Sequence, residues 1–494
     1  MAGRSRAPLV AAMVLVVLLA GCTSDQDRKG DGAEGATPDT DGSTGAPPTP
    51  LPSSLPDPDG SRLDRAWLHN GSGLMAPSDG VLMAFGYAAL PKTVEVHTGY
   101  DGAEPSIGVT PEGNLFVIAG TQTLRSSDGG LSWEVVKRDP ITADPLLWVD
   151  RDTGRVFTVQ LYVGCSYLHH SDDEGEAWEV NPVACGLPVN DHQKMTTAPR
   201  TVANPTASYP NVVYYCASQI AAAQCSVSQD GGKTFVGTFA VPPGQCGGVH
   251  GMPWGAQDGM VYLPYISCSG PAVAVTEDNG ASWTVREGPP GRGGGGFDPD
   301  AVTTPDGTLY LMYTGSDHLP YLVRSKDKGA TWDGPFALAP EGVGSSVFAA
   351  LAVGDDGRLA ATYVATDDHK GRPDSAPANA TWDLYIAMTL DGDAADPWFL
   401  TLQASKDPVQ RGRVCTEGAQ CDDARNLLDF IDATVDHEGR VYVASTDGCT
   451  SRTCTGADGT AASSKAGETT VYRIDEGPSL LAKRPWLMPL GDGE

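Results

Sequence analysis

The sequence has no second long apolar run, few basic residues and no C-x-x-C motif. After residues 9–20, no stretch approaches the roughly 18 apolar residues that a membrane-spanning helix needs, so we expect the rest of the chain to lie outside the membrane. The 33 basic residues against 62 acidic ones give a formal net charge of -29, which argues against nucleic-acid partners. Without C-x-x-C or a nearby histidine at zinc-ligand spacing, we expect no thiolate metal site. We assign no metal ligands and no cofactor from the sequence, and a structural calcium is left open.

The single apolar run has the features of an export signal. Arg4 and Arg6 precede residues 9–20, a length typical of a signal-peptide core and too short to span a bilayer. The run ends in "LAGC" at residues 19–22, which resembles the lipobox of bacterial lipoproteins. The resemblance implies that residues 1–21 are removed and that Cys22 carries acyl chains. We therefore expect an exported protein, lipid-anchored to the outer face of the bacterial cell membrane.

A tether and a folded domain follow. The linker at residues 22–60 is dominated by Asp, Gly, Pro, Ser and Thr and has no aromatic residue, so we expect it to be disordered, with a reach on the order of 35 Å. Residues 61–93 are interpreted as an extension that packs on or closes the main domain. That domain is assigned to residues 94–480, and residues 481–494 form a tail.

Ten cysteines remain after Cys22, an even number that favours disulfides in an exported chain. Their spacing suggests that sequence neighbours pair. The predicted pairs are Cys165 with Cys185, Cys216 with Cys225, Cys246 with Cys268, Cys415 with Cys421, and Cys449 with Cys454.

Five eight-residue stretches repeat an acid, a glycine and an aromatic residue. They are "SSDGGLSW", "SDDEGEAW", "SQDGGKTF", "TEDNGASW" and "SKDKGATW", starting at residues 126, 171, 228, 276 and 325. Their spacing of 45, 57, 48 and 49 residues is close to that of a four-stranded propeller blade. Seven hairpin patterns occur along the chain, several with a turn glycine such as Gly113, Gly307, Gly357 or Gly439. We predict an all-β chain with one β-propeller of seven four-stranded blades, with six blades as the alternative.

The repeated stretch resembles the Asp-box, or BNR repeat, of sialidase-like propellers, over roughly residues 94–475. The resemblance implies that each box forms the turn between the third and fourth strands of a blade. The chemistry agrees, because an aspartate accepts backbone N–H groups in a tight turn, glycine allows positive φ and tryptophan packs between blades. One acid per turn supplies too few oxygens for calcium, so we interpret the boxes as scaffold.

Counting from the turn glycines gathers polar residues at one end of the ring. Residues before the first strand of a blade and after the second share a face, so both groups should surround the axial mouth. The predicted binding residues are Glu104, Asp144, His250, Asp298, Asp300 and Asp432 as polar contacts, Tyr265, Tyr313 and Tyr363 as sugar-stacking platforms, and Arg425. The alternative interpretation is structural: carboxylates that only satisfy turn N–H groups and tyrosines that only pack between blades. Long loops near residues 366–383 and 446–468 open onto the same face.

Three functions remain open. A sialidase-like site would need three arginines from several blades. Arg125 and Arg324 precede boxes and look structural, whereas Arg411, Arg413 and Arg425 all come from one segment. We therefore favour a surface propeller, expected to be monomeric, that binds a glycan or envelope component. The alternatives are a sialidase-like or related glycoside hydrolase, with Asp298 and Asp432 as candidate acid and base, and a protein-binding assembly factor.

Overall fold

The computed structural model describes residues 66–75, 91–140, 142, 144–162, 165–185, 191–218, 222–243, 250–289, 298–416, 421, 427–449 and 467–490. All of them belong to a compact unit that begins at Pro48. The signal run, Cys22 and the predicted tether lie outside the described residues. No helix in these ranges is long and apolar enough to cross a membrane.

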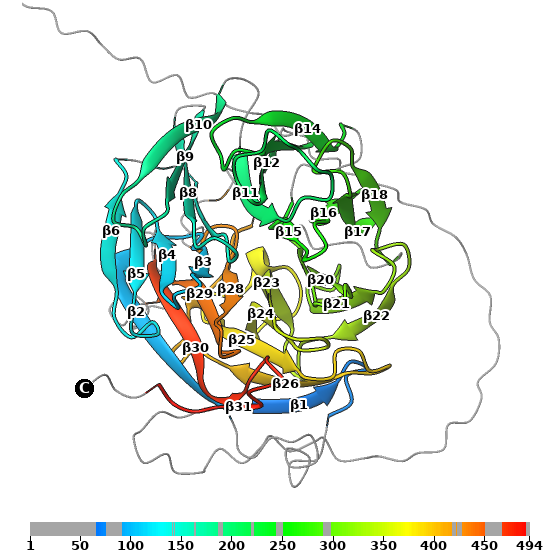
Figure 1. Ribbon diagram of the computed structural model, residues 1–494. Helices are drawn as coiled ribbons and strands as arrows, with labels where there is room; N and C mark the ends of the chain where they lie inside the picture. Colours follow the sequence, from blue (N-terminus) through cyan, green and yellow to red (C-terminus); the bar gives the residue numbers. More distant parts are fainter. Residues whose placement is uncertain are drawn as a thin grey trace, which may run out of the picture. The chain divides into compact units, whose positions relative to one another are not determined.

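Seven antiparallel sheets make up this unit, and five of them are formed by consecutive strands (Figure 1). In chain order, their strands are β3 (Ile107–Val109), β4 (Leu115–Ala119), β5 (Gln122–Ser126) and β6 (Glu134–Arg138) in blade 1; β7 (Pro145–Val149), β8 (Val156–Tyr162), β9 (Cys165–Ser171) and β10 (Glu179–Cys185) in blade 2; β11 (Asp191–Ala198), β12 (Val212–Ser218), β13 (Ala223–Ser228) and β14 (Val236–Val241) in blade 3; β15 (Trp254–Gly255), β16 (Val261–Ser267), β17 (Gly270–Thr276) and β18 (Thr284–Glu287) in blade 4; and β19 (Asp300–Thr303), β20 (Leu309–Thr314), β21 (Pro320–Ser325) and β22 (Asp333–Ala337) in blade 5.

The other two sheets combine strands from both ends of the chain. Blade 6 consists of β23 (Ser345–Val353), β24 (Leu359–Thr366), β25 (Thr381–Thr389) and β26 (Trp398–Gln403), and the N-terminal β1 (Ala66–Asn70) adds to β26. In blade 7, β28 (Asp432–Val435), β29 (Val441–Asp447) and β30 (Glu468–Pro478) are completed by β2 (Lys92–Asp101). The short strands β27 (Gln410–Arg411) and β31 (Trp486–Leu487) pair with β25 and β30, and the 3-10 helix η1 (Pro373–Ser375) lies between β24 and β25.

The innermost strands close a ring. Each of β3, β7, β11, β15, β19 and β23 contacts the inner strand of the next blade, and β28 contacts β3 to complete the circle. The predicted propeller of seven blades is therefore confirmed, and the six-bladed alternative is wrong. Strand β2 supplies the outer strand of the last blade, so the N-terminal and C-terminal parts of the domain hold the ring together.

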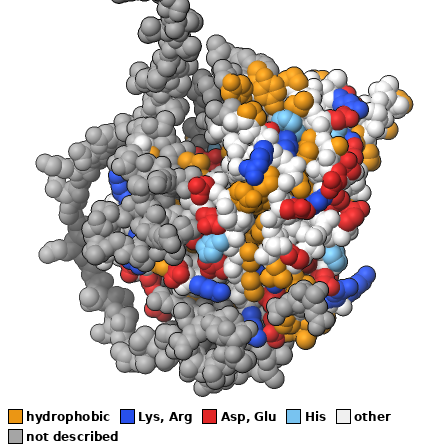
Figure 2. All heavy atoms as spheres, turned by 90° about the vertical axis from the view of Figure 1, so that its left-hand side faces the viewer, with side chains coloured by type: hydrophobic (Ala, Val, Ile, Leu, Met, Phe, Trp, Pro, Cys, Tyr) orange, Lys and Arg blue, Asp and Glu red, His pale blue; other side chains and the backbone are white. Residues whose placement is uncertain are grey.

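Burial falls from the axis to the rim. In blade 1, every residue of β4 is buried, whereas the outer β6, with sequence EVVKR, has none buried. The middle strands are apolar on both faces because each blade is covered by a neighbour on either side. Acidic side chains form several patches on the described surface of the side of the ring that carries β6, and they outnumber the Lys and Arg side chains there (Figure 2). This distribution agrees with the strongly negative formal charge.

The repeated motifs adopt the predicted turns. Gly113 and Gly307, at the first hairpin turns of blades 1 and 5, have φ of 92° and 85°. Each of the five boxes joins the third strand of its blade to the fourth. In the first box, one oxygen of Asp128 accepts the backbone N–H groups of Leu131 and Ser132, and Trp133 packs against the neighbouring core. A degenerate sixth box that the sequence reading missed follows β25, where Asp391 accepts the N–H of Trp398.

Two of the five predicted disulfides are confirmed. Cys216 is bonded to Cys225, and Cys415 is bonded to Cys421. The cysteines Cys165, Cys268 and Cys449 are also disulfide-bonded. The side chains of their predicted partners Cys185, Cys246 and Cys454 lie outside the described part of the chain, so these three pairings stay predictions.

Candidate functional site

Polar side chains from six blades meet where the innermost strands begin. We call this group the axial cluster, and it consists of Glu104, Asp144, His192, Lys194, His250, Asp298, Asp429 and Phe430. Most of these residues directly precede an inner strand, while His192 and Lys194 lie on β11 itself. The sequence predicted Glu104, Asp144, His250 and Asp298, and the structure brings these four together.

Glu104 is the most perturbed acid of the axial cluster. Its side chain is buried and hydrogen-bonded to the carboxyl group of Asp429, which comes from blade 7. Burial raises the pKa of Glu104 well above its usual value, and the charges of Asp144 and Asp429 raise it further. Lys194 opposes this shift without cancelling it. Glu104 and Asp429 therefore form a hydrogen-bonded carboxyl pair in which the protonated form of Glu104 is favoured.

Two histidines lie beside this pair. His192 Nε2 is hydrogen-bonded to Asp298 Oδ2. Burial lowers the pKa of His192, but the charge and the hydrogen bond of Asp298 outweigh burial, so this pKa is raised. His250 is fully buried, and burial together with the charge of His192 lowers its pKa to about 4. Its Nδ1 lies 3.1 Å from the carbonyl oxygen of Gly251. Nδ1 must donate in that bond, so Nε2 is an acceptor, and Nε2 has no hydrogen-bond partner among the described residues.

Lys194 lies at the centre of the axial cluster, and the sequence reading missed it. Only 2% of it is exposed, its Nζ lies 3.8 Å from Asp298 Oδ2, and the ammonium group sits over the ring of Phe430. Its charge also acts on Glu104 and on two further acids, Asp300 and Asp432. A buried ammonium is tolerated because these carboxylates surround it.

The backbone is strained at the same entry points. Glu104, His192, Phe348 and Leu428 have φ between 54° and 61°, the left-handed region that non-glycine residues rarely adopt. Each lies at or just before the inner strand of a different blade. Such strain costs on the order of 1 kcal/mol per residue and persists where the surroundings over-determine the conformation. The axial cluster is thus held rigidly in place.

Asp300 and Asp432 serve as braces between blades. Asp300 Oδ2 accepts the N–H of Leu351 from blade 6 at 2.7 Å, and Asp432 Oδ2 accepts the N–H of Ile107 from blade 1 at 2.8 Å. Burial raises the pKa of Asp300 to about 8 and that of Asp432 to about 6. These bonds favour the structural alternative for Asp300 and Asp432 over their predicted role as ligand contacts and over Asp432 as a catalytic partner of Asp298.

The three predicted tyrosine platforms are part of the core. Tyr265, Tyr313 and Tyr363 are at most 1% exposed, so a sugar ring has no access to their faces. Tyr363 stacks on Tyr385 with ring centroids 5.5 Å apart and donates its hydroxyl to the carbonyl oxygen of Leu338. Packing between apolar blade faces explains all three positions. Their burial favours the structural alternative over the predicted binding role.

Two of the arginines discussed from the sequence have structural contacts, and the role of a third is untested. Arg125 donates to the carbonyl oxygen of Glu174 in the next blade, and Arg324 donates to that of Gly392, so both are structural as expected. Arg425 lies outside the described residues, and its predicted role stays untested. Arg411 lies on β27, which pairs with β25. The described chain thus shows no arginine triad at the axial cluster.

The opposite end of the axis holds a separate cavity of about 360 Å³. It is lined by residues in or just after the inner strands, including Trp254 and Thr303 within strands and Thr110 and Asp355 after them. Arg151 also lines it and donates to Thr434 Oγ1 at 2.7 Å. Burial lowers the pKa of Arg151, and the charge of Asp432 offsets part of that shift. The charges of Arg151 at this cavity and of Lys194 in the axial cluster both act on Asp432, and each opposes the rise that burial causes in its pKa.

No family model and no curated protein matches the chain. Solved structures with a similar fold include the lectin BP39L from Burkholderia pseudomallei, with a TM-score of 0.47 and 12% identity over 75% of this chain and 98% of the lectin. YCF48 bound to D1 peptide gives a TM-score of 0.44 and 10% identity over 78% and 96%. The intramolecular trans-sialidase from Ruminococcus gnavus gives 0.36 and 14% over 80% and 96%, and a GH74 enzyme from Niastella koreensis is also similar. These neighbours are propellers with different functions, so a functional conclusion for this chain must come from its own residues.

Proposed function

We propose that the axial cluster binds an uncharged carbohydrate of the cell surface or its surroundings. In this proposal the protein is an Asp-box propeller, anchored through Cys22 to the outer face of the bacterial membrane and held away from it by residues 23–60. It acts as a monomer, because one ring contains the whole site.

The supporting observation is the convergence of buried donors and acceptors from six blades. The carboxylate of Asp298 is an acceptor and Lys194 is a donor, the raised pKa of Glu104 favours its protonated, donating form, and the fully buried His250 keeps an Nε2 acceptor without a partner among the described residues. A sugar hydroxyl both donates and accepts, so it needs such a mixture at short range. Phe430 adds an aromatic ring at the same place.

The charges of the axial cluster favour a neutral sugar over an acidic one. Four carboxyl groups, those of Glu104, Asp144, Asp298 and Asp429, surround the single ammonium of Lys194. A sugar carboxylate would meet this excess of acid without the bidentate arginines that bind such groups well. Sialic acid is therefore a poor candidate ligand.

A glycan array with the purified protein tests the proposal. We expect binding to at least one neutral glycan, and a loss of affinity of at least about tenfold in His250→Ala and Asp298→Asn, because each removes an acceptor. Asp128→Ala, in an exposed box turn, is the matched control and should bind like the wild type. No binding to any neutral glycan, or equal binding by all variants, would reject the proposed function.

The carboxyl pair supports glycoside hydrolysis as a second candidate. A hydrolase needs one carboxyl that keeps its proton and another that stays ionised close by. Glu104 has the raised pKa, and Asp429 and Asp144 are its nearest acidic neighbours. Turnover of a fluorogenic neutral glycoside by the wild type, abolished in Glu104→Gln, would establish this activity, whereas binding without turnover would leave the binding function alone.

A further inference from the structure

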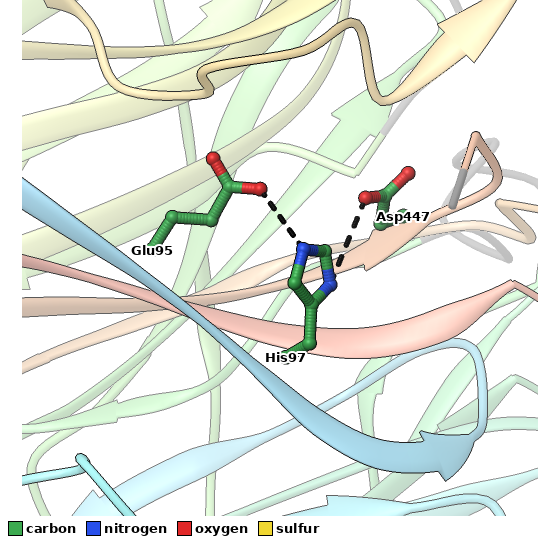
Figure 3. Close-up of side chains that lie close together, drawn as sticks. All are labelled: Glu95, His97 and Asp447. Atoms are coloured by element: carbon green, nitrogen blue, oxygen red, sulfur yellow. Dashed lines mark ion pairs between the residues drawn. The ribbon is translucent and has the colours of Figure 1, made fainter. Parts of the chain in front are cut away.

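A second group of ligand-type side chains lies far from the axial cluster, on blade 7. Glu95 and His97 come from the N-terminal strand β2, and Asp447 ends β29 near the C-terminus. One donor atom from each residue lies within 4.8 Å of the other two. The imidazole ring of His97 sits between the two carboxyl groups (Figure 3).

The distances suit a small cation with short bonds. His97 Nε2 lies 3.3 Å from Glu95 Oε1, and Nδ1 lies 4.0 Å from Asp447 Oδ2 and 3.9 Å from Glu468 Oε2. The donors of a tetrahedral site with bonds of about 2.1 Å are about 3.4 Å apart, so small side-chain movements would complete such a site. Only one ring nitrogen can bind the ion. The other would keep a hydrogen bond to a carboxylate or to Thr470 Oγ1, which is the usual way that a ligating histidine is oriented.

Three carboxylates meet in this group, each accepts one backbone N–H, from Lys406, Cys449 or Gly99, and cationic side chains are few around them. Glu95 and Asp447 have side chains only 7% and 6% exposed, and Glu468 is close to both. In the described part of the chain, the basic side chain that pairs with these three carboxylates is His97 alone, with no lysine or arginine. A half-buried imidazole cannot balance three carboxylates, so the site favours an added positive charge.

An unpaired hydroxyl gives independent support. Tyr472 is fully buried, and its Oη has no hydrogen-bond partner among the described residues. It is paired across strands with Glu95, so the two side chains project from the same face of the sheet. After burial, the charges of Glu95 and Asp447 contribute most to raising the pKa of Tyr472. A buried phenol without a partner beside the group is a polar atom that a metal-bound water would satisfy.

We propose that Glu95, His97 and Asp447 bind a first-row divalent cation, with Zn²⁺ as the best fit. Imidazole together with carboxylates suits Zn²⁺, whereas Ca²⁺ prefers oxygen ligands only. The ion would connect β2 to β29 and so stabilise the closure of the ring. The sequence alone assigned no metal ligands, because these ligands lie 350 residues apart (447 − 97) and form no local motif.

Zn²⁺ titration of the chelator-treated full chain tests the site. We expect one equivalent to bind, and the melting temperature to rise by about 3 °C when free Zn²⁺ is about 100 times its Kd. Asp447→Asn keeps the shape of the side chain but removes its charge, and it should weaken Zn²⁺ binding at least tenfold, as should His97→Ala. His437→Ala removes an exposed histidine at the far cavity and should bind Zn²⁺ like the wild type.

Other outcomes would overturn the assignment. Wild-type protein that takes up no Zn²⁺, or Asp447→Asn protein that binds it as tightly as the wild type, excludes these ligands. Parallel titrations with Mn²⁺ and Ca²⁺ test the ion class. Tighter binding of Ca²⁺ than of Zn²⁺ would show that the imidazole is not a ligand. Glycan binding at the axial cluster is expected to be the same with and without the ion, so a failure of this site is distinguishable from a failure of the proposed function.

Discussion

The box turns and the axial cluster use acidic side chains in opposite ways. Asp128 in the first box is exposed, and bonds from Ser132 and Ser126 outweigh partial burial to lower its pKa. Glu104 at the axis is buried beside other acids, and its pKa is raised. An acid whose pKa is lowered stabilises the fold when it is ionised, whereas one whose pKa is raised destabilises it. The axial cluster therefore carries an electrostatic cost of buried acidic charge that the box turns do not, and function is expected where such perturbed groups collect.

Removal of Lys194 should have the largest effect. Lys194→Met leaves the surrounding carboxylates without their central positive charge, and we expect the free energy of unfolding to fall by about 3 kcal/mol at pH 8. The loss should be smaller at pH 5, because the carboxylates can then take up protons. Urea denaturation at pH 8 and at pH 5 measures the loss of unfolding free energy at each pH. An equal loss at both pH values would mean that Lys194 acts through packing and not through its charge.

The bracing role of Asp300 predicts the next largest effect. Asp300→Ala removes the acceptor of two backbone N–H groups, those of Leu351 and Ala301, and should lower the free energy of unfolding by about 2 kcal/mol. Thermal unfolding measures this loss. Glycan affinity should be unchanged if the folded fraction is accounted for. A selective loss of binding in a stable Asp300→Ala protein would return this residue to the site and blur the distinction between brace and ligand contact.

Replacement of Glu104 should stabilise the fold. A raised pKa means that the folded state resists ionisation, so the wild type loses stability as the pH rises from the unfolded pKa toward the higher folded pKa. Glu104→Gln cannot ionise, and we expect it to be about 1 kcal/mol more stable than the wild type at pH 8, with little difference at pH 4. Denaturation measured between pH 4 and pH 8 tests whether the variant is more or less stable than the wild type. A variant less stable at every pH would contradict the assigned carboxyl pair.

The sequence predicted the ring and about half of the axial cluster for the same reason. A repeat fixes where each inner strand begins, so Glu104, Asp144, His250 and Asp298 could be found by counting from a turn. Lys194 could not, because blade 3 joins β11 to β12 through residues 199–211 without the turn glycine that set the count. Asp429 follows a long linker that the count also skips.

Counting residues from a turn glycine predicts where a residue lies along its strand, but it does not predict whether its side chain is exposed. Tyr265, Tyr313 and Tyr363 end their strands near the predicted face, yet adjacent blades cover both surfaces of each sheet. A tyrosine there is buried whichever way it points. The group of Glu95, His97 and Asp447 escaped prediction for a different reason, since it forms only when the two ends of the domain pair in one blade.

A substitution in a box turn should have the smallest effect. Asp128→Ala removes an acceptor of the N–H groups of Leu131 and Ser132, but both groups are exposed and water can replace the lost bonds. We expect a loss of about 0.5 kcal/mol, measured by urea denaturation, and unchanged glycan affinity. Five similar turns share this bracing role, so a single substitution is tolerated. A large loss of binding in Asp128→Ala would place function at the rim and remove the reason for assigning it to the axis.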